Sequence, residues 1–205
     1  MSKRTIAIVC GGDSSEYEVS QRSAQGLYSF FDKERYNIYI VLLRGQEWKV
    51  YLEDGTTATI DRNDFSFIEN GKVVQFDYAY ITIHGTPGEN GLLQGYLEMM
   101  GVPYNTCSAY VSAITFDKHS CKRFIEHAGV RMAKDVFIRR GSGYNPQEIV
   151  AELGLPVFVK PTNGGSSFGI TKVKRVEDLE AAVELVFKEY DSVIIEESIV
   201  GRELT

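Results

Sequence analysis

The stretch that most constrains the fold is Leu155–Val173, where a lysine, a glycine-rich turn and two short strands follow one another. Val157 to Lys160 is a run of apolar, β-branched and aromatic residues, and Pro161 ends it by removing a backbone donor. Ile170 to Val173 alternates as a second strand. The stretch therefore predicts a hairpin with a lysine at the end of its first strand.

The turn of this hairpin has the composition of an anion-binding loop. Gly164, Gly165 and Gly169 can take positive φ at little cost, so backbone amides and the hydroxyls of Ser166 and Ser167 can converge on an anion. The lysine precedes the glycines, which excludes the P-loop of helix-type NTPases. Such a loop can instead cover phosphates, as the glycine-rich loop of protein kinases does. The alternative is an ordinary hairpin with a surface lysine.

The chain opens with the pattern of an α/β unit. Thr5 to Cys10 is a buried strand, Gly11–Ser15 is the turn after it, and a helix follows with Ser15 and Glu18 at capping-box spacing. Ligands bind at the carboxyl ends of strands in open α/β sheets, so Glu16 is placed to meet one. Its alternative role is a favourable acid near a helix N-terminus.

A second loop leaves the carboxyl end of another strand. Tyr36 to Leu43 is a strand, and short alternating runs separated by hairpin turns make Trp48–Phe76 an antiparallel excursion. Tyr78 to Ile83 returns to a buried strand and runs into a polar, glycine-rich loop. His84, the first residue of that loop, is either a ligand contact or a satisfied loop histidine.

The middle of the chain is expected to be helical and to contain a domain boundary. Leu92 to Met100 forms a helix with Gly101 as its C-terminal cap, and the boundary is placed near Tyr104. Phe116 to Ala128 forms the next helix. Lys118 in this helix is by default a solvated lysine.

The last stretch ends an apolar strand with two acids. Glu196 and Glu197 follow Val193 to Ile195, and a third acid, Glu203, comes seven residues after Glu196. Such carboxylates can accept hydrogen bonds from an adenine amino group and from ribose hydroxyls, or they can be solvated turn residues. The other elements expected here are a strand at Val136–Arg139 and helices at Gln147–Leu153 and Val176–Tyr190.

Composition narrows the choice of partner. The net charge of −6 argues against nucleic acid, and the basic residues are scattered, which leaves no polybasic membrane patch. The three cysteines, Cys10, Cys107 and Cys121, form no C-x-x-C pair, so a reducing cytoplasm fits best. The apolar run Ile6–Cys10 is too short for a signal peptide.

Four motifs together resemble the D-alanine:D-alanine ligases of the ATP-grasp superfamily. They are Gly11–Ser20, His84–Gly95, the pair Asp117-Lys118, and Val159-Lys160-Pro161 with the glycine loop that follows. The resemblance implies an α/β fold: an N-terminal Rossmann-like (pre-ATP-grasp) domain over residues 1–103 and an incomplete ATP-grasp domain over residues 104–205. The family joins two D-alanines through an acyl phosphate, with ATP and Mg²⁺, for peptidoglycan synthesis.

The resemblance also implies the site residues. Glu16 and Ser166 would be catalytic: Glu16 would hold the ammonium of the first D-alanine, with Ser166 oriented beside it, and His84 would line that subsite. The residues implied for ATP are Lys118 and Lys160 on the phosphates, Gly165, Ser166, Ser167, Phe168 and Gly169 as the covering flap, Glu196 on the adenine amino group, the backbone of Glu197 and Ile199 on the ring, and Glu203 on the ribose.

The chain departs from the family pattern in length and at two positions. Asn90 stands where aspartate is usual, and Glu197 stands where lysine is common. The family's C-terminal third, with its magnesium ligands, is not found in these 205 residues, so we expect the chain alone to be inactive. A homodimer is expected. The alternatives are another ATP-grasp carboxylate–amine ligase and a non-catalytic nucleotide-binding module.

Overall fold

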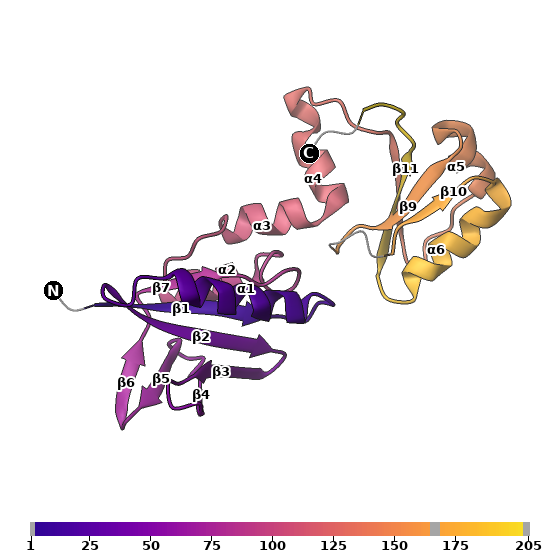
Figure 1. Cartoon of the computed structure of the whole chain (residues 1–205). Coiled ribbons are helices and arrows are strands. Elements are labelled where there is room, and N and C mark those ends of the chain that lie inside the picture. The colour runs from indigo at the N-terminus through magenta and orange to yellow at the C-terminus, as the bar shows by residue number, and fades with distance from the viewer. Residues whose placement is uncertain (1–2, 165–168, 203–205) are drawn as a thin grey trace. The chain divides into compact units, whose positions relative to one another are not determined.

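The computed structural model describes residues 3–164 and 169–202, which fold as two compact units, Met1–Ala113 and Ile114–Thr205 (Figure 1). Each unit has its own sheet and its own buried core. The α/β fold class expected from the sequence is confirmed.

The first unit is built on a five-stranded sheet in the order β4-β3-β2-β1-β7. The central strands β1, β2 and β7 are parallel, and β3 and β4 add antiparallel to β2, as the excursion predicted. A separate hairpin, β5–β6, completes the strands. The bounds are β1 Arg4–Gly11, β2 Tyr36–Arg44, β3 Glu47–Tyr51, β4 Thr57–Thr59, β5 Ser66–Glu69, β6 Lys72–Gln75 and β7 Tyr78–Ile81, with helices α1 Tyr17–Phe30 and α2 Leu92–Met100.

Strand β1 is buried on both faces because successive side chains point to opposite sides of a strand. Ile8 packs with Ala24 of α1, whereas Val9 belongs to the larger core that includes Leu93 and Leu97 of α2. The parallel strands β1 and β7 end at the same edge of the sheet. The two loops that follow them therefore lie at that edge.

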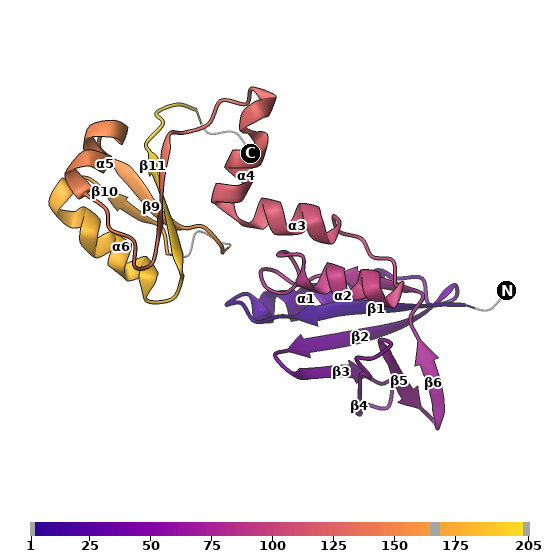
Figure 2. The same cartoon turned by 180° about the vertical axis from the view of Figure 1, so that it is seen from behind.

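The second unit is a four-stranded antiparallel sheet in the order β10-β9-β11-β8. Figures 1 and 2 show α5 and α6 on one face of it, where they bury a core of β-branched and leucine side chains. The bounds are α3 Ala109–Phe116, α4 Lys118–Ile125, the 3-10 turn Glu126–Ala128, β8 Asp135–Arg139, α5 Pro146–Leu153, β9 Val157–Pro161, β10 Thr171–Val173, the 3-10 turn Val176–Asp178, α6 Leu179–Phe187 and β11 Ser192–Glu197.

Alternation along β9 and β11 places the charged residues on the sheet face away from α5 and α6. Val159 and Ile195 point into the core, whereas Lys160 and Glu196 point to the other face. Because β9 and β11 are neighbours, these two side chains lie together. The charges of Lys160 and Glu196 therefore lie on the face opposite the core formed with α5 and α6.

The helix expected over Phe116–Ala128 is present as α4 and the 3-10 turn that follows it, but it begins at Lys118, because Asp117 separates α3 from α4. The Asp117 carboxylate accepts a hydrogen bond from the backbone of Ser120 at 2.7 Å and its backbone is extended, so it ends α3 and caps α4. The expected Ser15–Glu18 capping box is also wrong. Helix α1 begins at Tyr17 after its N-cap Glu16, and no side chain caps this end of the helix.

The division between the units falls after Ala113, later than the position near Tyr104 expected from the sequence. Tyr104 still forms a β-bridge with Ala79, and the Asn105 side chain accepts a hydrogen bond from the Ile81 amide at 2.7 Å. These contacts keep the segment after α2 with the first unit. Among the helices in the described residues, none is both long and apolar enough to span a bilayer.

Candidate functional site

In the first unit, backbone hydrogen bonds join the loops that follow β1 and β7. The Asp13 amide donates to the Thr86 carbonyl at 2.8 Å, and the Ser14 hydroxyl donates to the His84 carbonyl at 2.8 Å. The Gly12 amide donates to the Leu43 carbonyl at 2.8 Å, which attaches the first loop to β2 as well. The two loops therefore form one surface.

Close approach of the two loops requires glycine at Gly12. Its φ is +88°, and a Cβ added there would lie 2.5 Å from Cγ2 of Ile83 and 3.0 Å from the Thr86 carbonyl oxygen. Any larger residue would push the loops apart. The glycine motif after β1 is thus explained by packing of one loop against the other.

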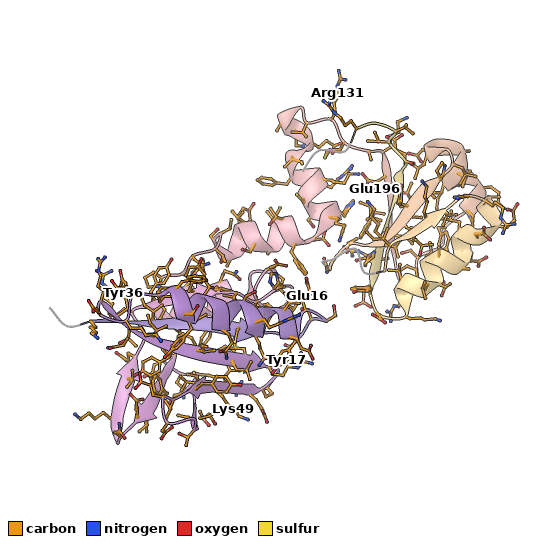
Figure 3. The ribbon with its side chains drawn as sticks, in the orientation of Figure 1. Glu16, Tyr17, Tyr36, Lys49, Arg131 and Glu196 are labelled. Atoms are coloured by element: carbon orange, nitrogen blue, oxygen red, sulfur yellow. The ribbon has the colours of Figure 1, made fainter. Side chains whose placement is uncertain are left out.

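Glu16 lies at the start of α1 beside Tyr17, where Figure 3 labels both residues. Its amide donates to the Ser14 hydroxyl at 3.2 Å, and the N-terminal end of the helix favours its negative charge. The Tyr17 ring stacks under the Arg44 guanidinium at 4.5 Å, and Arg44 donates to the Gly12 carbonyl at 2.8 Å. The loop that presents Glu16 is therefore fixed from several sides.

His84 lies in the loop that follows β7, three residues after the strand ends at Ile81. Its side chain is half-buried, and its carbonyl is the acceptor for Ser14. The loop is closed on itself by Glu89, whose carboxylate accepts from the Gly85 amide at 2.8 Å. The structure thus brings Glu16 and His84 onto one surface, an acid and an imidazole suited to an amino-acid ligand.

In the second unit, Lys118 begins α4 and reaches the start of the glycine loop. Its amide donates to the Thr162 carbonyl at 2.8 Å, and its ammonium donates to the Gly164 carbonyl at 3.0 Å. Burial, and then the nearby positive charge of Lys160, hold the pKa of Lys118 below its ordinary value. An anion placed between two ammonium groups that repel one another would be attracted to both.

Lys160 and Glu196 form an ion pair on the charged face of the sheet. The Lys160 ammonium is 2.6 Å from Oε2 of Glu196, and Lys122 is 2.8 Å from Oε1. Burial raises the pKa of Glu196, but hydrogen bonds from Lys122 and Lys160 outweigh it and hold this pKa below its ordinary value. Glu196, labelled in Figure 3, is therefore an ionised acceptor.

Glu197 exchanges two hydrogen bonds with the segment before β8. Its amide donates to the Lys134 carbonyl at 3.0 Å, and its carboxylate accepts from the Lys134 amide at 2.7 Å. Because the Glu197 amide already donates to Lys134, the Glu197 carbonyl is the backbone group that could contact a ligand ring. Ile199, two residues on, has 69% of its side chain exposed.

Several predicted residues lie outside the described part of the chain: Gly165, Ser166, Ser167, Phe168 and Glu203. The glycines on either side of the first four are described. Gly164 has φ +125° and Gly169 has φ +77°, as the loop composition predicts. Gly169 lies close to the ring of Pro161.

A magnesium ion would need ligands other than the lysines. Among residues 3–164 and 169–202 there is no group of three or more His, Cys, Asp or Glu side chains that could hold a metal ion. The carboxylates beside the lysines are engaged with cations of the chain itself. This part of the chain does not fit a magnesium site, and we derive no step through the metal.

Sequence reasoning missed Lys122 and Asp135. Lys122 lies one helical turn after Lys118, so both project from the same side of α4. A second lysine at that spacing is the signal that could have suggested a carboxylate partner nearby. No sequence signal indicated Asp135 as that partner, because Asp135 lies in strand β8 and not in the helix that carries Lys122.

Two family models match the chain in its two halves. One, described as D-ala D-ala ligase N-terminus, matches residues 5–107, and the other, described as D-ala D-ala ligase C-terminus, matches residues 124–205. The chain belongs to the D-alanine–D-alanine ligase family. The resemblance seen in the motifs is confirmed.

Among curated relatives, the D-alanine–D-alanine ligase of Phocaeicola vulgatus is 57% identical over 203 residues, which is 99% of this chain. The chain spans 63% of the length of that relative.

Solved structures agree on the fold. The VanG D-Ala:D-Ser ligase of Enterococcus faecalis is similar with a TM-score of 0.83 and 32% identity, over 98% of this chain and 64% of that one. The D-alanine–D-alanine ligase of Bacillus anthracis, complexed with ATP, is similar with a TM-score of 0.76 and 29% identity, over 97% of this chain and 60% of that one.

Proposed function

We propose that this chain carries the ATP site and the first D-alanine site of a cytoplasmic D-alanine–D-alanine ligase that forms ADP. The reaction joins two D-alanines through an acyl phosphate and supplies a dipeptide for peptidoglycan. The observation that carries the proposal is the pair of ammonium groups of Lys118 and Lys160, which repel one another beside the ionised Glu196. We also propose a homodimer, by the family resemblance.

The three charged residues suit different parts of ATP. Lys118 and Lys160 would bind its phosphates, because a phosphate between them relieves their repulsion and neutralises charge on the group in transfer. Glu196 would accept a hydrogen bond from the adenine amino group. ATP supplies the phosphoryl group that activates a carboxylate. Magnesium remains part of the proposal, with no ligand assigned among the described residues.

The flap and the ribose contact belong to the proposal through the resemblance. The residues concerned are Gly165, Ser166, Ser167, Phe168 and Gly169 over the phosphates and Glu203 at the ribose. The backbone of Glu197 and Ile199 would contact the adenine ring. Gly164 supports a role for the loop, because its carbonyl accepts a hydrogen bond from the Lys118 ammonium. This bond connects the loop to a residue proposed to bind phosphate.

The amino-acid half of the proposal rests on Glu16 and His84. Glu16 would pair with the ammonium of D-alanine, together with Ser166, and His84 would line the same subsite. Support comes from the hydrogen bonds that hold the two loops together and from the favourable place of an acid at the start of α1. Because the D-ala D-ala ligase family models match both halves of the chain, the alternatives of a sister ligase and of a non-catalytic module are not favoured.

The nucleotide site is tested by equilibrium binding of ATP to the 205-residue chain. Lys118→Met should raise the Kd for ATP by about tenfold or more, because a charge-assisted hydrogen bond to phosphate is lost. Lys188→Met, on the exposed end of α6, is the matched control and should leave the Kd unchanged. An equal effect of both substitutions would contradict the assignment of Lys118.

The reaction is tested by phosphate release from Mg-ATP, with the reading frame that contains this chain expressed to its stop codon. Release should depend on D-alanine. Release that ignores D-alanine but responds to another amino or hydroxy acid would move the proposal to a sister ligase and leave only the ATP-site residues in place.

A further inference from the structure

Two carboxylates face one another across neighbouring strands on the charged face of the second sheet. Glu196 of β11 and Asp135 of β8 are direct partners in the antiparallel register. Like charges directly opposite one another destabilise a sheet. A third group must therefore compensate this pair.

Lys122 of α4 lies between the two carboxylates. Its ammonium is 2.7 Å from Oδ1 of Asp135 and 2.8 Å from Oε1 of Glu196, and it also donates to the Ala133 carbonyl at 2.7 Å. The residue is 9% exposed. Three acceptors fill the three donors of an ammonium group, so its position is fully determined.

Neutralising the charges of Asp135 and Glu196 does not by itself explain why Lys122 lies between them. Asp135 has a second cation in Arg123, at 2.9 Å, and Glu196 has a second cation in Lys160, at 2.6 Å. What Lys122 adds is orientation. It takes one oxygen of Glu196 while Lys160 takes the other, which fixes the plane of the carboxylate between a lysine of helix α4 and a lysine of strand β9.

A carboxylate held in this way keeps further lone pairs on both oxygens. It can accept from a ligand amino group, and it offers no donor to a ligand carbonyl. Adenine carries an amino group at position 6 of the ring, whereas hypoxanthine and guanine carry an oxygen there. Discrimination between these bases depends on the carboxylate staying ionised and correctly turned.

We propose that Lys122 is a positioning residue that sets the preference for a 6-amino purine by fixing Glu196. The inference rests on the proposed function, in which Glu196 accepts from the adenine amino group. Lys122 has all its donors engaged with the chain, so it acts through Glu196 and not on the nucleotide.

The test compares ATP with ITP, which has an oxygen at position 6, in equilibrium binding to the 205-residue chain. Lys122→Met should raise the Kd for ATP by about tenfold and leave the Kd for ITP nearly unchanged. The variant should fold, because Asp135 keeps Arg123 and Glu196 keeps Lys160. Arg123→Met is the matched control: it removes a cation from Asp135 without touching Glu196, and the ATP/ITP preference should persist.

A double variant separates positioning from a general structural effect. If Lys122 acts through Glu196, Lys122→Met should weaken ATP binding little further in a chain that already carries Glu196→Gln. Equal losses for ATP and ITP, or additive losses in the double variant, would overturn the inference.

The outcomes also distinguish this inference from the proposed function. If the unmodified chain binds ATP and ITP equally, or binds neither, the adenine contact of Glu196 fails and the inference fails with it. If the unmodified chain prefers ATP and Lys122→Met keeps the full preference, only the role of Lys122 is overturned. Thermal unfolding by circular dichroism verifies that each variant is folded.

Discussion

The two candidate sites, one in each unit, are positioned by different kinds of interaction. In the first unit, the loops that carry Glu16 and His84 are joined by hydrogen bonds from a backbone amide and from the Ser14 hydroxyl to backbone carbonyls, and by glycines that allow close approach. In the second unit, Lys160 and Glu196 are positioned by ion pairs between side chains of a helix and of neighbouring strands. Hydrogen bonds to backbone groups position the site of the first unit, and ion pairs position the site of the second unit.

This difference determines what each half is sensitive to. Backbone hydrogen bonds do not titrate near neutral pH, so the first unit should respond to changes in space and backbone conformation. A network of carboxylates and ammonium groups should respond to protonation and to the loss of one partner.

The largest effect is expected for Gly12→Ala. The new Cβ would meet Ile83 at 2.5 Å, and the residue would keep a φ of +88°, so we expect a loss of about 3 kcal/mol or more in the stability of the first unit. Trp48, the chain's single tryptophan, lies in this unit, and its fluorescence during urea unfolding reports that loss.

Gly26→Ala is the control for this substitution. Gly26 lies inside α1, and an added Cβ would meet nothing within 4 Å, so the helix should gain about 0.5–1 kcal/mol. If Gly12→Ala behaved like Gly26→Ala, the claim that close packing of the loops requires glycine would be wrong.

A smaller loss is expected for Ser20→Ala in α1. The fully buried Ser20 hydroxyl accepts from the Gly11 amide at 3.0 Å and donates to the Thr82 carbonyl at 2.9 Å. Its removal leaves a buried amide without this partner, which costs about 1–3 kcal/mol. Tryptophan fluorescence again measures it, and Ser29→Ala on the exposed side of the same helix should change stability by less than about 0.5 kcal/mol.

The smallest effect is confined to acid pH and to the second unit. Because the pKa of Glu196 is lower in the folded state than its ordinary value, the stabilisation it gives is complete above that ordinary value and is lost as the pH falls through the lower folded pKa. Glu196→Gln should remove this part of the acid dependence. Circular dichroism of urea unfolding at several pH values reports both units, and the tryptophan signal recorded beside it reports the first unit alone.

Two comparisons make the acid-pH experiment specific. Glu180→Gln, at an exposed position of α6, should leave the acid dependence as it is in the unmodified chain. The tryptophan signal of the first unit should be insensitive to Glu196→Gln, since the two units have separate cores. A change in that signal would show that the halves do not respond independently.

The elements were predictable where a regular hydrophobic pattern coincided with a strong local boundary signal. The α2 helix has the predicted bounds Leu92–Met100 and ends at Gly101, which takes φ +69° as a C-terminal cap. Strand β1 extends the predicted strand by one residue at each end. The break at Asp117 was missed, because a capping aspartate inside an apolar stretch carries no obvious signal until its side chain is seen to accept from Ser120.

By itself, the sequence determined the family, the α/β class and the residues that bear charge, because motif order, glycine positions and alternation are local properties of the chain. Only the tertiary structure decided which charges meet. Lys122, Asp135 and Glu196 come from α4, β8 and β11, and their contact depends on strand order and register. A sequence records each residue's neighbours along the chain, whereas the free energy of a charge depends on its neighbours in space.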